Sequence, residues 1–282
     1  MPDPQTERIA REVCARHGFV FEGHFGSGSF KEVFRAKAAD GSLVAIKISK
    51  PQALSIRNQR EVEVMKRLDH PSIAKLFVAE SVQDRQVHFL VTHEEWLGGG
   101  SLAQRVQRVS PIEIFAIGGA LLHALIGIWG MGLVHRDIKP DNILFRTSDG
   151  SPVLTDFGIV RDLSAQSLTQ TSAWMGPGTP LFASPEQLNN DKSLIDARSD
   201  QFGLAAALYF SATGRHPYQG PHEDHNQAIN NAGLRKGPSR VFTDWATAAG
   251  LPVLARMAAP WPINRFRFPD DLINAWNSQA PN

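Results

Sequence analysis

The sequence has almost no cysteine, almost no net charge and no repeated segment. Its single cysteine, Cys14, excludes a disulfide within the chain and suits a reducing compartment, so we expect a cytoplasmic protein. The 29 basic and 28 acidic residues leave a net charge of +1, which gives no reason to expect nucleic acid or an anionic membrane as the main partner. The first residues include the charged Asp3, Glu7 and Arg8 and contain no long apolar stretch. We therefore expect no signal peptide.

One long segment lacks formal charge. Residues 115–134 form a run of twenty that is long enough to cross a bilayer. The run contains His123 and five glycines, and Glu113 lies just before it. A helix that is apolar all round can equally be the buried core helix of a large domain. We therefore expect a core helix and no membrane partner.

Strand patterns dominate the first third of the chain. Residues 1–17 are polar and predict a short flanking helix. The segments VFEGHF, KEVFRAKA and SLVAIKIS are rich in Val, Phe and Ile, and Asp40-Gly41 is a hairpin signal between the last two. One helical stretch, 57–68, interrupts the strands. The glycines of segment 93–101 predict a flexible connection between lobes.

Helical patterns dominate the rest. We expect helices at 102–109, 111–130, 185–188 and 196–213, and two short strands at 143–145 and 153–155. At 282 residues and 42% hydrophobic content the chain can bury a sizeable core. The sequence thus predicts an α+β fold with a small β-rich lobe at 18–96 that holds one main helix, and a larger helical lobe at 97–282.

A glycine-containing segment and a lysine strand suggest a phosphate site. Gly26 and Gly28 lie between strand segments, where the missing Cβ lets a hairpin backbone approach phosphates closely. In the strand Val44-Ala45-Ile46-Lys47, Ala45 and Lys47 share a face. A small residue beside an ammonium suits a flat base next to a phosphate tail. Alone, the two glycines are more typical of an ordinary turn, and Lys47 is typical of a solvated strand lysine.

The helix predicted at 57–68 offers a counter-ion for Lys47. At helical spacing Glu61 lies on an apolar stripe, where a carboxylate is costly unless it is paired. We expect Glu61 to pair with Lys47, and Glu63 to be a solvated surface acid.

The strongest chemical signal is the segment 135–142, HRDIKPDN, followed by Asp156-Phe157-Gly158. Phosphoryl transfer needs a base for the attacking hydroxyl, oxygen ligands for Mg²⁺ and cations over the phosphates. Asp137 can accept the hydroxyl proton, and Lys139 lies close enough to neutralise a phosphate. Asn142 and Asp156 offer the hard oxygens that Mg²⁺ prefers.

In this order the residues resemble the signature set of protein kinases, and most closely the bacterial members of the Hanks-type (eukaryotic-like) Ser/Thr kinases. The resemblance runs from Phe25 to about Arg265. It implies a two-lobed fold with ATP in the cleft, Mg²⁺ (or Mn²⁺) as cofactor and a protein Ser or Thr hydroxyl as acceptor. It also implies Asp137, Lys139, Lys47 and Glu61 as catalytic residues and Asn142 and Asp156 as metal ligands. The ATP-binding set implied is Phe25, Gly26, Ser27, Gly28, Ser29, Val33, Ala45, Lys47 and Leu144.

Further landmarks of the family follow. Thr92 or Glu94 should fall near the gatekeeper and hinge. Gly178-Thr179-Pro180 and Ser184-Pro185-Glu186 resemble the substrate-docking end of the activation loop. Arg265 matches the arginine that pairs with this glutamate, and Asp200 the acid that braces the catalytic loop.

The resemblance also implies regulation. Thr169 and Thr171 lie in a segment like the phospho-acceptor stretch of bacterial kinases, and Arg136 beside Asp137 can bind a phosphate there. We expect autophosphorylation at both threonines, with a transient homodimer for the reaction. We expect a free-standing kinase without a sensor domain, and a partner or substrate surface in the polar region 216–240, which holds His216.

Three positions depart from the family pattern: Lys31 replaces a loop glycine, Ala205 a helix glycine and Trp261 an aspartate. None of them removes a chemical group. Two alternatives stay open, a kinase-like scaffold without turnover and a small-molecule phosphotransferase. The scaffold would predict loss of Lys47 or Asp137, and the phosphotransferase would lack the docking elements at 178–186.

Overall fold

The computed structural model describes residues 2–27, 31–49, 66, 68–156, 180–279 and 281. The predicted helix at 57–65, and with it Glu61, lies outside these residues. So do Gly28, Ser29, Thr169, Thr171, Gly178 and Thr179. The described chain divides into two compact units. Unit 1 ends at Leu97, and unit 2 begins at Gly98.

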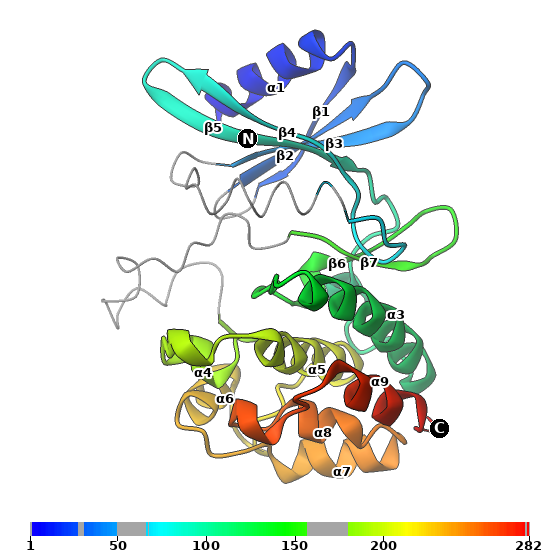
Figure 1. Ribbon diagram of the computed structural model, residues 1–282, viewed down its shortest axis with the longest axis vertical. Helices are drawn as coiled ribbons and strands as arrows, with labels where there is room; N and C mark the ends of the chain where they lie inside the picture. Colours follow the sequence, from blue (N-terminus) through cyan, green and yellow to red (C-terminus); the bar gives the residue numbers. More distant parts are fainter. Residues whose placement is uncertain are drawn as a thin grey trace. The chain divides into compact units, whose positions relative to one another are not determined.

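Unit 1 is a five-stranded antiparallel sheet of order β1-β2-β3-β5-β4, with helix α1 across one face (Figure 1). The strands are β1 Val20–Ser27, β2 Lys31–Lys37, β3 Leu43–Ser49, β4 Leu76–Asp84 and β5 Val87–Glu95. Helix α1, Pro4–Arg16, starts where the side chain of Asp3 accepts a hydrogen bond from the Gln5 backbone N–H and Pro4 occupies the first turn. This start confirms the predicted flanking helix.

The alternation of side chains gives the sheet two different faces. One face packs under α1 in a single apolar core with its buried residues, which include Ile9, Val13, Phe34, Ile46 and Val91. The residues between them in sequence point to the other face, and among these is Lys47 of β3. The predicted hairpin at Asp40-Gly41 is confirmed, since the Asp40 carboxylate accepts from the Ser42 N–H at 2.9 Å and Gly41 has a φ of +87°.

The predicted flexible connection at 93–101 is wrong at both ends. Strand β5 continues to Glu95, so His93 to Glu95 are paired with β3. Gly99 donates its N–H to the Phe145 carbonyl at 2.8 Å, and a Cβ on Gly99 would lie 2.6 Å from that oxygen. Close packing of backbone on backbone, and not flexibility, accounts for the glycine.

Unit 2 is mainly helical, with one small hairpin. Its strands are β6 Ile143–Phe145 and β7 Pro152–Leu154, and 3₁₀ turns η2 Leu102–Arg105, η3 Pro140–Asn142, η5 Lys192–Leu194 and η6 Pro262–Asn264 connect its elements. The helices are α3 Pro111–Gly130, α4 Pro185–Leu188, α5 Ala197–Thr213, α6 His225–Gly233, α7 Arg240–Ala248, α8 Val253–Met257 and α9 Pro269–Asn277.

The helix predicted at 102–109 forms only the short η2. Val106 adopts an extended backbone with ψ of 134°, and Gln107 has a φ of +62°, which a right-handed helix does not accommodate. The N–H of Gln107 instead donates to the carbonyl of Ser211 at 2.8 Å. A tertiary contact therefore replaces the local helical bond.

The uncharged run forms α3, the one helix among the described residues that is long and apolar enough to span a membrane by length and composition. In the structure it packs against α5, α9 and β7, and Ile114, Leu121 and Leu125 are fully buried. Its start is fixed by a capping box in which Ser110 and Glu113 exchange side-chain and backbone hydrogen bonds. These contacts are those of a core helix.

Candidate active site

Unit 2 gathers an acid, an ammonium and an amide on the segment between α3 and β6. Lys139 Nζ lies 3.1 Å from Oδ2 of Asp137. The amide nitrogen of Asn142 donates to the backbone carbonyl of Asp137 at 2.8 Å and to its Oδ2 at 3.1 Å. The side chain of Asp137 is 22% exposed, so a hydroxyl group can still reach the carboxylate. This arrangement suits a base whose position is fixed before a substrate arrives.

His135 anchors the segment that carries Asp137, Lys139 and Asn142 through hydrogen bonds of its buried ring. Its ring is fully buried, and burial lowers its pKa, which keeps the ring neutral. Nδ1 accepts the backbone N–H of Asp137 at 3.3 Å, so Nε2 carries the proton and donates to the Thr155 carbonyl at 3.0 Å. A neutral imidazole thus uses its one donor and one acceptor to join Asp137 to the end of β7.

Asp200, in the first turn of α5, holds the backbone of the same segment. Its carboxylate accepts from the N–H of His135 at 2.9 Å, from the N–H of Arg136 at 2.8 Å and from Trp129 Nε1 at 2.9 Å. Burial raises the pKa of Asp200, and these donors and the neighbouring His135 oppose that rise. The predicted brace is confirmed, and Trp129 is a third donor that the sequence pattern did not reveal.

Arg136 has a φ of +67°, which is uncommon for a residue with a side chain. Its N–H is held by Asp200, and its carbonyl accepts from Gln187 Nε2 of α4 at 2.8 Å. The surrounding contacts therefore impose the unusual conformation, as is typical of functional segments.

Asn142 and Asp156, the predicted metal ligands, come from the adjacent ends of η3 and β7. The backbone N–H of Thr155 donates to the Asn142 carbonyl at 2.9 Å, so Asp156 directly follows a residue that is bonded to Asn142. Because the amide nitrogen of Asn142 faces Asp137, its amide oxygen points away from that carboxylate. One amide oxygen and one carboxylate are the donor set that Mg²⁺ takes in proteins, so these residues fit the predicted metal.

In unit 1, Lys47 is held by an acid that the sequence analysis did not assign to it. Lys47 Nζ lies 2.5 Å from Oε2 of Glu94, whose other oxygen accepts from Thr92 Oγ1 at 2.8 Å. Lys47 and Thr92 are cross-strand partners, and Glu94 stands two residues along β5 on the same face. The spacing of Thr92 and Glu94 shows that the two residues share a strand face, but it does not show that this face meets Lys47. The expected pair of Lys47 with Glu61 lies outside the described residues.

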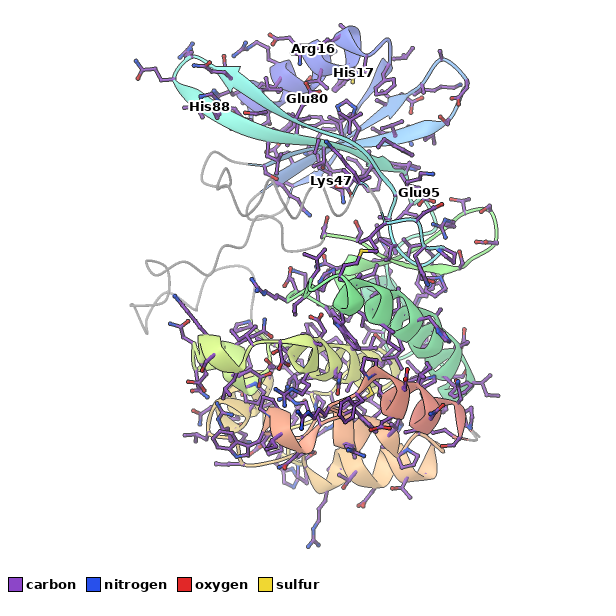
Figure 2. The ribbon with its side chains drawn as sticks, viewed as in Figure 1. Arg16, His17, Lys47, Glu80, His88 and Glu95 are labelled. Carbon is purple, nitrogen blue, oxygen red and sulfur yellow. The ribbon has the colours of Figure 1, made fainter. Side chains whose placement is uncertain are left out.

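The other predicted ATP-binding residues of unit 1 fall on the face that carries Lys47. Val33 is its cross-strand partner on β2, and Ala45 precedes it by two residues on β3. Figure 2 shows Lys47 on the side of the sheet away from α1. Phe25, Gly26 and Ser27 end β1, where the exposed Phe25 ring packs edge-on against Trp96 and a Cβ on Gly26 would meet open space. Leu144 lies on β6 in unit 2.

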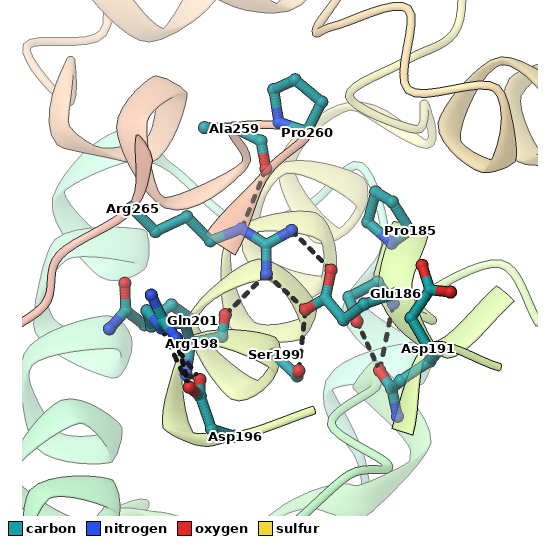
Figure 3. A network of polar contacts seen from close by, with 12 residues as sticks. Pro185, Glu186, Asp191, Asp196, Arg198, Ser199, Gln201, Ala259, Pro260 and Arg265 are labelled. Atoms are coloured by element: carbon teal, nitrogen blue, oxygen red, sulfur yellow. Dashed lines mark hydrogen bonds and ion pairs between the residues drawn. The ribbon is translucent and has the colours of Figure 1, made fainter. Parts of the chain in front are cut away.

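Glu186 and Arg265 form the ion pair that the sequence predicted. Two nitrogens of the guanidinium lie 2.6 and 3.0 Å from the two carboxylate oxygens, and both side chains are fully buried (Figure 3). Burial by itself would raise the pKa of Glu186, but Arg265 and the Ser199 hydroxyl outweigh it and lower that pKa. Trp261, one of the departures from the family pattern, packs under the guanidinium of Arg235 at 3.8 Å.

The region 216–240 contains both buried and exposed polar residues, and His222, Asn226 and Asn230 are exposed. His216, Tyr218 and Asn231 are buried, and burial lowers the pKa of His216 to about 3. The Asn231 amide donates to the Glu223 carboxylate at 2.8 Å. These buried polar residues connect α6 to the core of unit 2, and the partner surface predicted for the exposed residues of the segment stays a prediction.

The described chain has the fold and the residues of a protein kinase, and comparison with known proteins agrees. The protein kinase domain family matches residues 19–248, and the chain belongs to this family. It is 35% identical over 228 residues to the serine/threonine-protein kinase AfsK of Streptomyces coelicolor, covering 78% of this chain and 27% of that protein. It is 34% identical over 201 residues to the probable serine/threonine-protein kinase PkwA of Thermomonospora curvata, covering 68% of this chain and 26% of that protein.

These relatives confirm the resemblance to Hanks-type Ser/Thr kinases that include bacterial members. The chain spans about a quarter of the length of the relatives just named. Among solved structures, Rad53 1-466 in complex with AMP-PNP superposes with a TM-score of 0.69 at 23% identity, over 95% of this chain and 69% of that one. The MAP kinase LmaMPK10 from Leishmania major superposes with a TM-score of 0.67 at 17% sequence identity. The superposition covers 97% of this chain and 87% of that one. Both likenesses confirm the two-lobed kinase fold.

Proposed function

We propose that this chain transfers the γ-phosphoryl group of Mg-ATP to serine and threonine hydroxyls of proteins. The observation that carries the proposal is the Asp137 carboxylate, which is fixed by Lys139 and Asn142 and is still partly exposed. A carboxylate placed in this way can orient a hydroxyl and accept its proton as the oxygen attacks.

Each remaining group has a defined task in this proposal. Lys139 supplies positive charge beside the attacked phosphoryl group, and Lys47 orients the phosphate tail. Asn142 and Asp156 would hold the metal, with Mn²⁺ as an alternative to Mg²⁺. When bound, Mg-ATP supplies the activated phosphoryl group and part of the charge neutralisation. The chain contributes mainly positioning and electrostatics, as is general for phosphoryl transfer.

Protein hydroxyls are favoured over small-molecule acceptors by the segment at 184–186. Ser184 and Gln187 form a capping box at the start of α4, and Glu186 is anchored by Arg265. This rigid platform follows directly on the predicted docking residues Gly178 and Thr179. Small-molecule phosphotransferases lack such an element.

The test compares phosphate incorporation from Mg-ATP into generic protein acceptors by the wild type, Asp137→Asn and Asp141→Asn. Asparagine keeps the shape but cannot accept the proton, so Asp137→Asn should lose at least about 100-fold in rate while nucleotide binding persists. Asp141 is an exposed neighbour, and its variant should retain wild-type activity. Absence of turnover by the wild type would favour a scaffold, and turnover on metabolites alone would favour a small-molecule enzyme.

We also propose that Thr169 and Thr171 are autophosphorylated, with a transient homodimer bringing two chains together. Arg136 supports this, because its Nε is buried and has no hydrogen-bond partner among the described residues. A phosphate would supply the missing acceptor. Mass spectrometry after incubation with Mg-ATP should find phosphate at both threonines, and their double replacement by Ala should lower activity. A chain that stays unmodified refutes the proposal.

The buried free thiol of Cys14 supports a cytoplasmic location.

A further inference from the structure

A cluster of two histidines and a glutamate lies on the α1 side of the sheet in unit 1, away from the face that carries Lys47. His17 is the residue at the C-terminal end of α1, Glu80 lies on β4 and His93 on β5. Figure 2 shows His17 and Glu80 together at this side. Three separate elements thus contribute one metal-ligating side chain each, and the proposed kinase chemistry uses none of them.

The ligand atoms of the cluster converge. Oε1 of Glu80 lies 2.9 Å from Nε2 of His17 and 3.2 Å from Nε2 of His93, and the ligand atoms of all three side chains lie within 4.8 Å of one another. A tetrahedral zinc ion with ligand bonds near 2.05 Å separates its ligand atoms by about 3.3 Å. The two distances from Glu80 are therefore close to those of a metal-bound set.

His93 supplies an independent indication of a ligand. Its side chain is completely buried, and neither ring nitrogen has a hydrogen-bond partner among the described residues. Nε2 is near Oε1 of Glu80, but not in the geometry of a hydrogen bond. A buried imidazole without a partner is costly, and a metal ion would satisfy it.

We propose that His17, Glu80 and His93 bind a divalent transition metal ion of the zinc class. Nε2 of each histidine and Oε1 of Glu80 provide three ligands, and water occupies the fourth position. Two imidazoles and a carboxylate suit Zn²⁺ better than Mg²⁺, which prefers oxygen ligands. The side chain of His17 is 29% exposed, which gives the ion a route from solvent.

The surroundings of the cluster are compatible with a bound cation. NH1 of Arg16 lies 2.6 Å from Oε2 of Glu80, whereas both histidines contact Oε1. Arg16 would therefore hold Glu80 in a monodentate orientation. Phe19 stacks with His17 at 5.9 Å and meets His93 edge-on at 5.7 Å, so an apolar ring shields one side of the site.

Binding would fasten the end of α1 to the two strands β4 and β5. In β5, His93 lies between Thr92 and Glu94, and on the opposite face Glu94 binds Lys47 while Thr92 donates to Glu94. An ion bound on the α1 side would thus stiffen the strand that positions Lys47. The site stands on its own contacts and does not depend on the proposed kinase activity.

Calorimetric titration of the full chain with Zn²⁺, without nucleotide, tests the site. The wild type should bind one more ion than His17→Ala or Glu80→Gln, or bind it at least about 100-fold more tightly. His88→Ala is the matched control, because His88 lies on the same strand β5 but outside the cluster, and it should bind like the wild type. His17 and Glu80 are partly exposed, so both variants should fold.

Titration with Co²⁺ identifies the geometry. The wild type and His88→Ala should develop the intense visible absorption of tetrahedral Co²⁺, and His17→Ala should not. A hard-oxygen site at Asn142 and Asp156 does not produce this spectrum. Equal Zn²⁺ binding by the wild type and His17→Ala would overturn the proposal. So would a wild type that binds neither metal, in which case the cluster is only a set of polar contacts between the two histidines and Glu80.

Discussion

The buried pair of Arg265 and Glu186 predicts a large loss of stability from a single substitution. Arg265 donates four hydrogen bonds, two to the Glu186 carboxylate and one each to the carbonyls of Ala259 and Arg198. In Arg265→Ala all four are lost, and Glu186 stays buried as an uncompensated charge. Breaking a buried pair in this way costs about 3–5 kcal/mol.

That cost is a large fraction of the about 5–15 kcal/mol by which a typical domain is stable. With a urea dependence of about 3 kcal/mol per molar, the unfolding midpoint should fall by about 1–1.7 M. Tryptophan fluorescence reports on unit 2, which contains the ion pair. Its described part holds four tryptophans, Trp129, Trp245, Trp261 and Trp276.

Two further variants separate the ion pair from a general loss of arginine. Arg267→Ala removes an exposed arginine two residues away and should move the midpoint by less than about 0.2 M. The double variant with Arg265→Ala and Glu186→Leu leaves no unpaired charge at this position, so it should be more stable than Arg265→Ala alone. A midpoint for Arg265→Ala within 0.3 M of the wild type (roughly 1 kcal/mol) would refute the reasoning.

The same pair sets a pH dependence. The pKa of Glu186 is lower in the folded chain than its ordinary value of 4.5. Its contribution to stability is therefore complete above pH 4.5 and is lost as the pH falls towards the lowered value. The stability difference between the wild type and Glu186→Gln should be constant from pH 7 to pH 5 and should shrink below that. A difference that grows on acidification would contradict the assignment.

Three other predictions follow from the described contacts. Asp200→Asn replaces an acceptor of three N–H groups by an amide that can accept at only one atom, so steady-state kinetics should show kcat reduced by at least about 100-fold with folding retained. Gly118→Ala in α3 would drive a Cβ into the Trp276 ring and cost about 1–3 kcal/mol in urea unfolding, whereas Gly127→Ala meets open space in the same helix and should gain about 0.5–1 kcal/mol. Burial raises the pKa of Cys14 to about 11, so iodoacetamide at pH 8 should leave the native thiol unmodified by mass spectrometry and should alkylate it in urea.

Residues that belong to contiguous motifs could be predicted from the sequence. The segment from His135 to Asn142 contains its own geometry, because Lys139 and Asn142 reach Asp137 within five residues. The pair of Glu186 with Arg265, 79 residues apart, was predicted only because the family resemblance linked the two positions.

Contacts that arise from sheet register or from long-range packing could not be predicted in the same way. Glu94 reaches Lys47 because β5 pairs with β3, and no pattern within either strand specifies that register. The glycines at 98–100 predicted a flexible connection because a sequence shows only that a Cβ is missing. It does not show that the backbone of Phe145 packs where a Cβ of Gly99 would lie. The burial of His216 and Asn231 could not be predicted for a similar reason, since hydrogen bonding within the core permits burial of side chains that usually face solvent.

The position of α1 has a practical consequence for anyone who shortens this protein. The family match begins at residue 19, so a truncation guided by that boundary would remove the whole helix. Phe34, Ile46 and Val91 would then face water on an uncovered sheet, and the single cysteine would be lost with the segment. Such a fragment should aggregate even though every catalytic motif is intact, and the lower practical limit for an expressible kinase domain is Asp3, the residue that caps the helix.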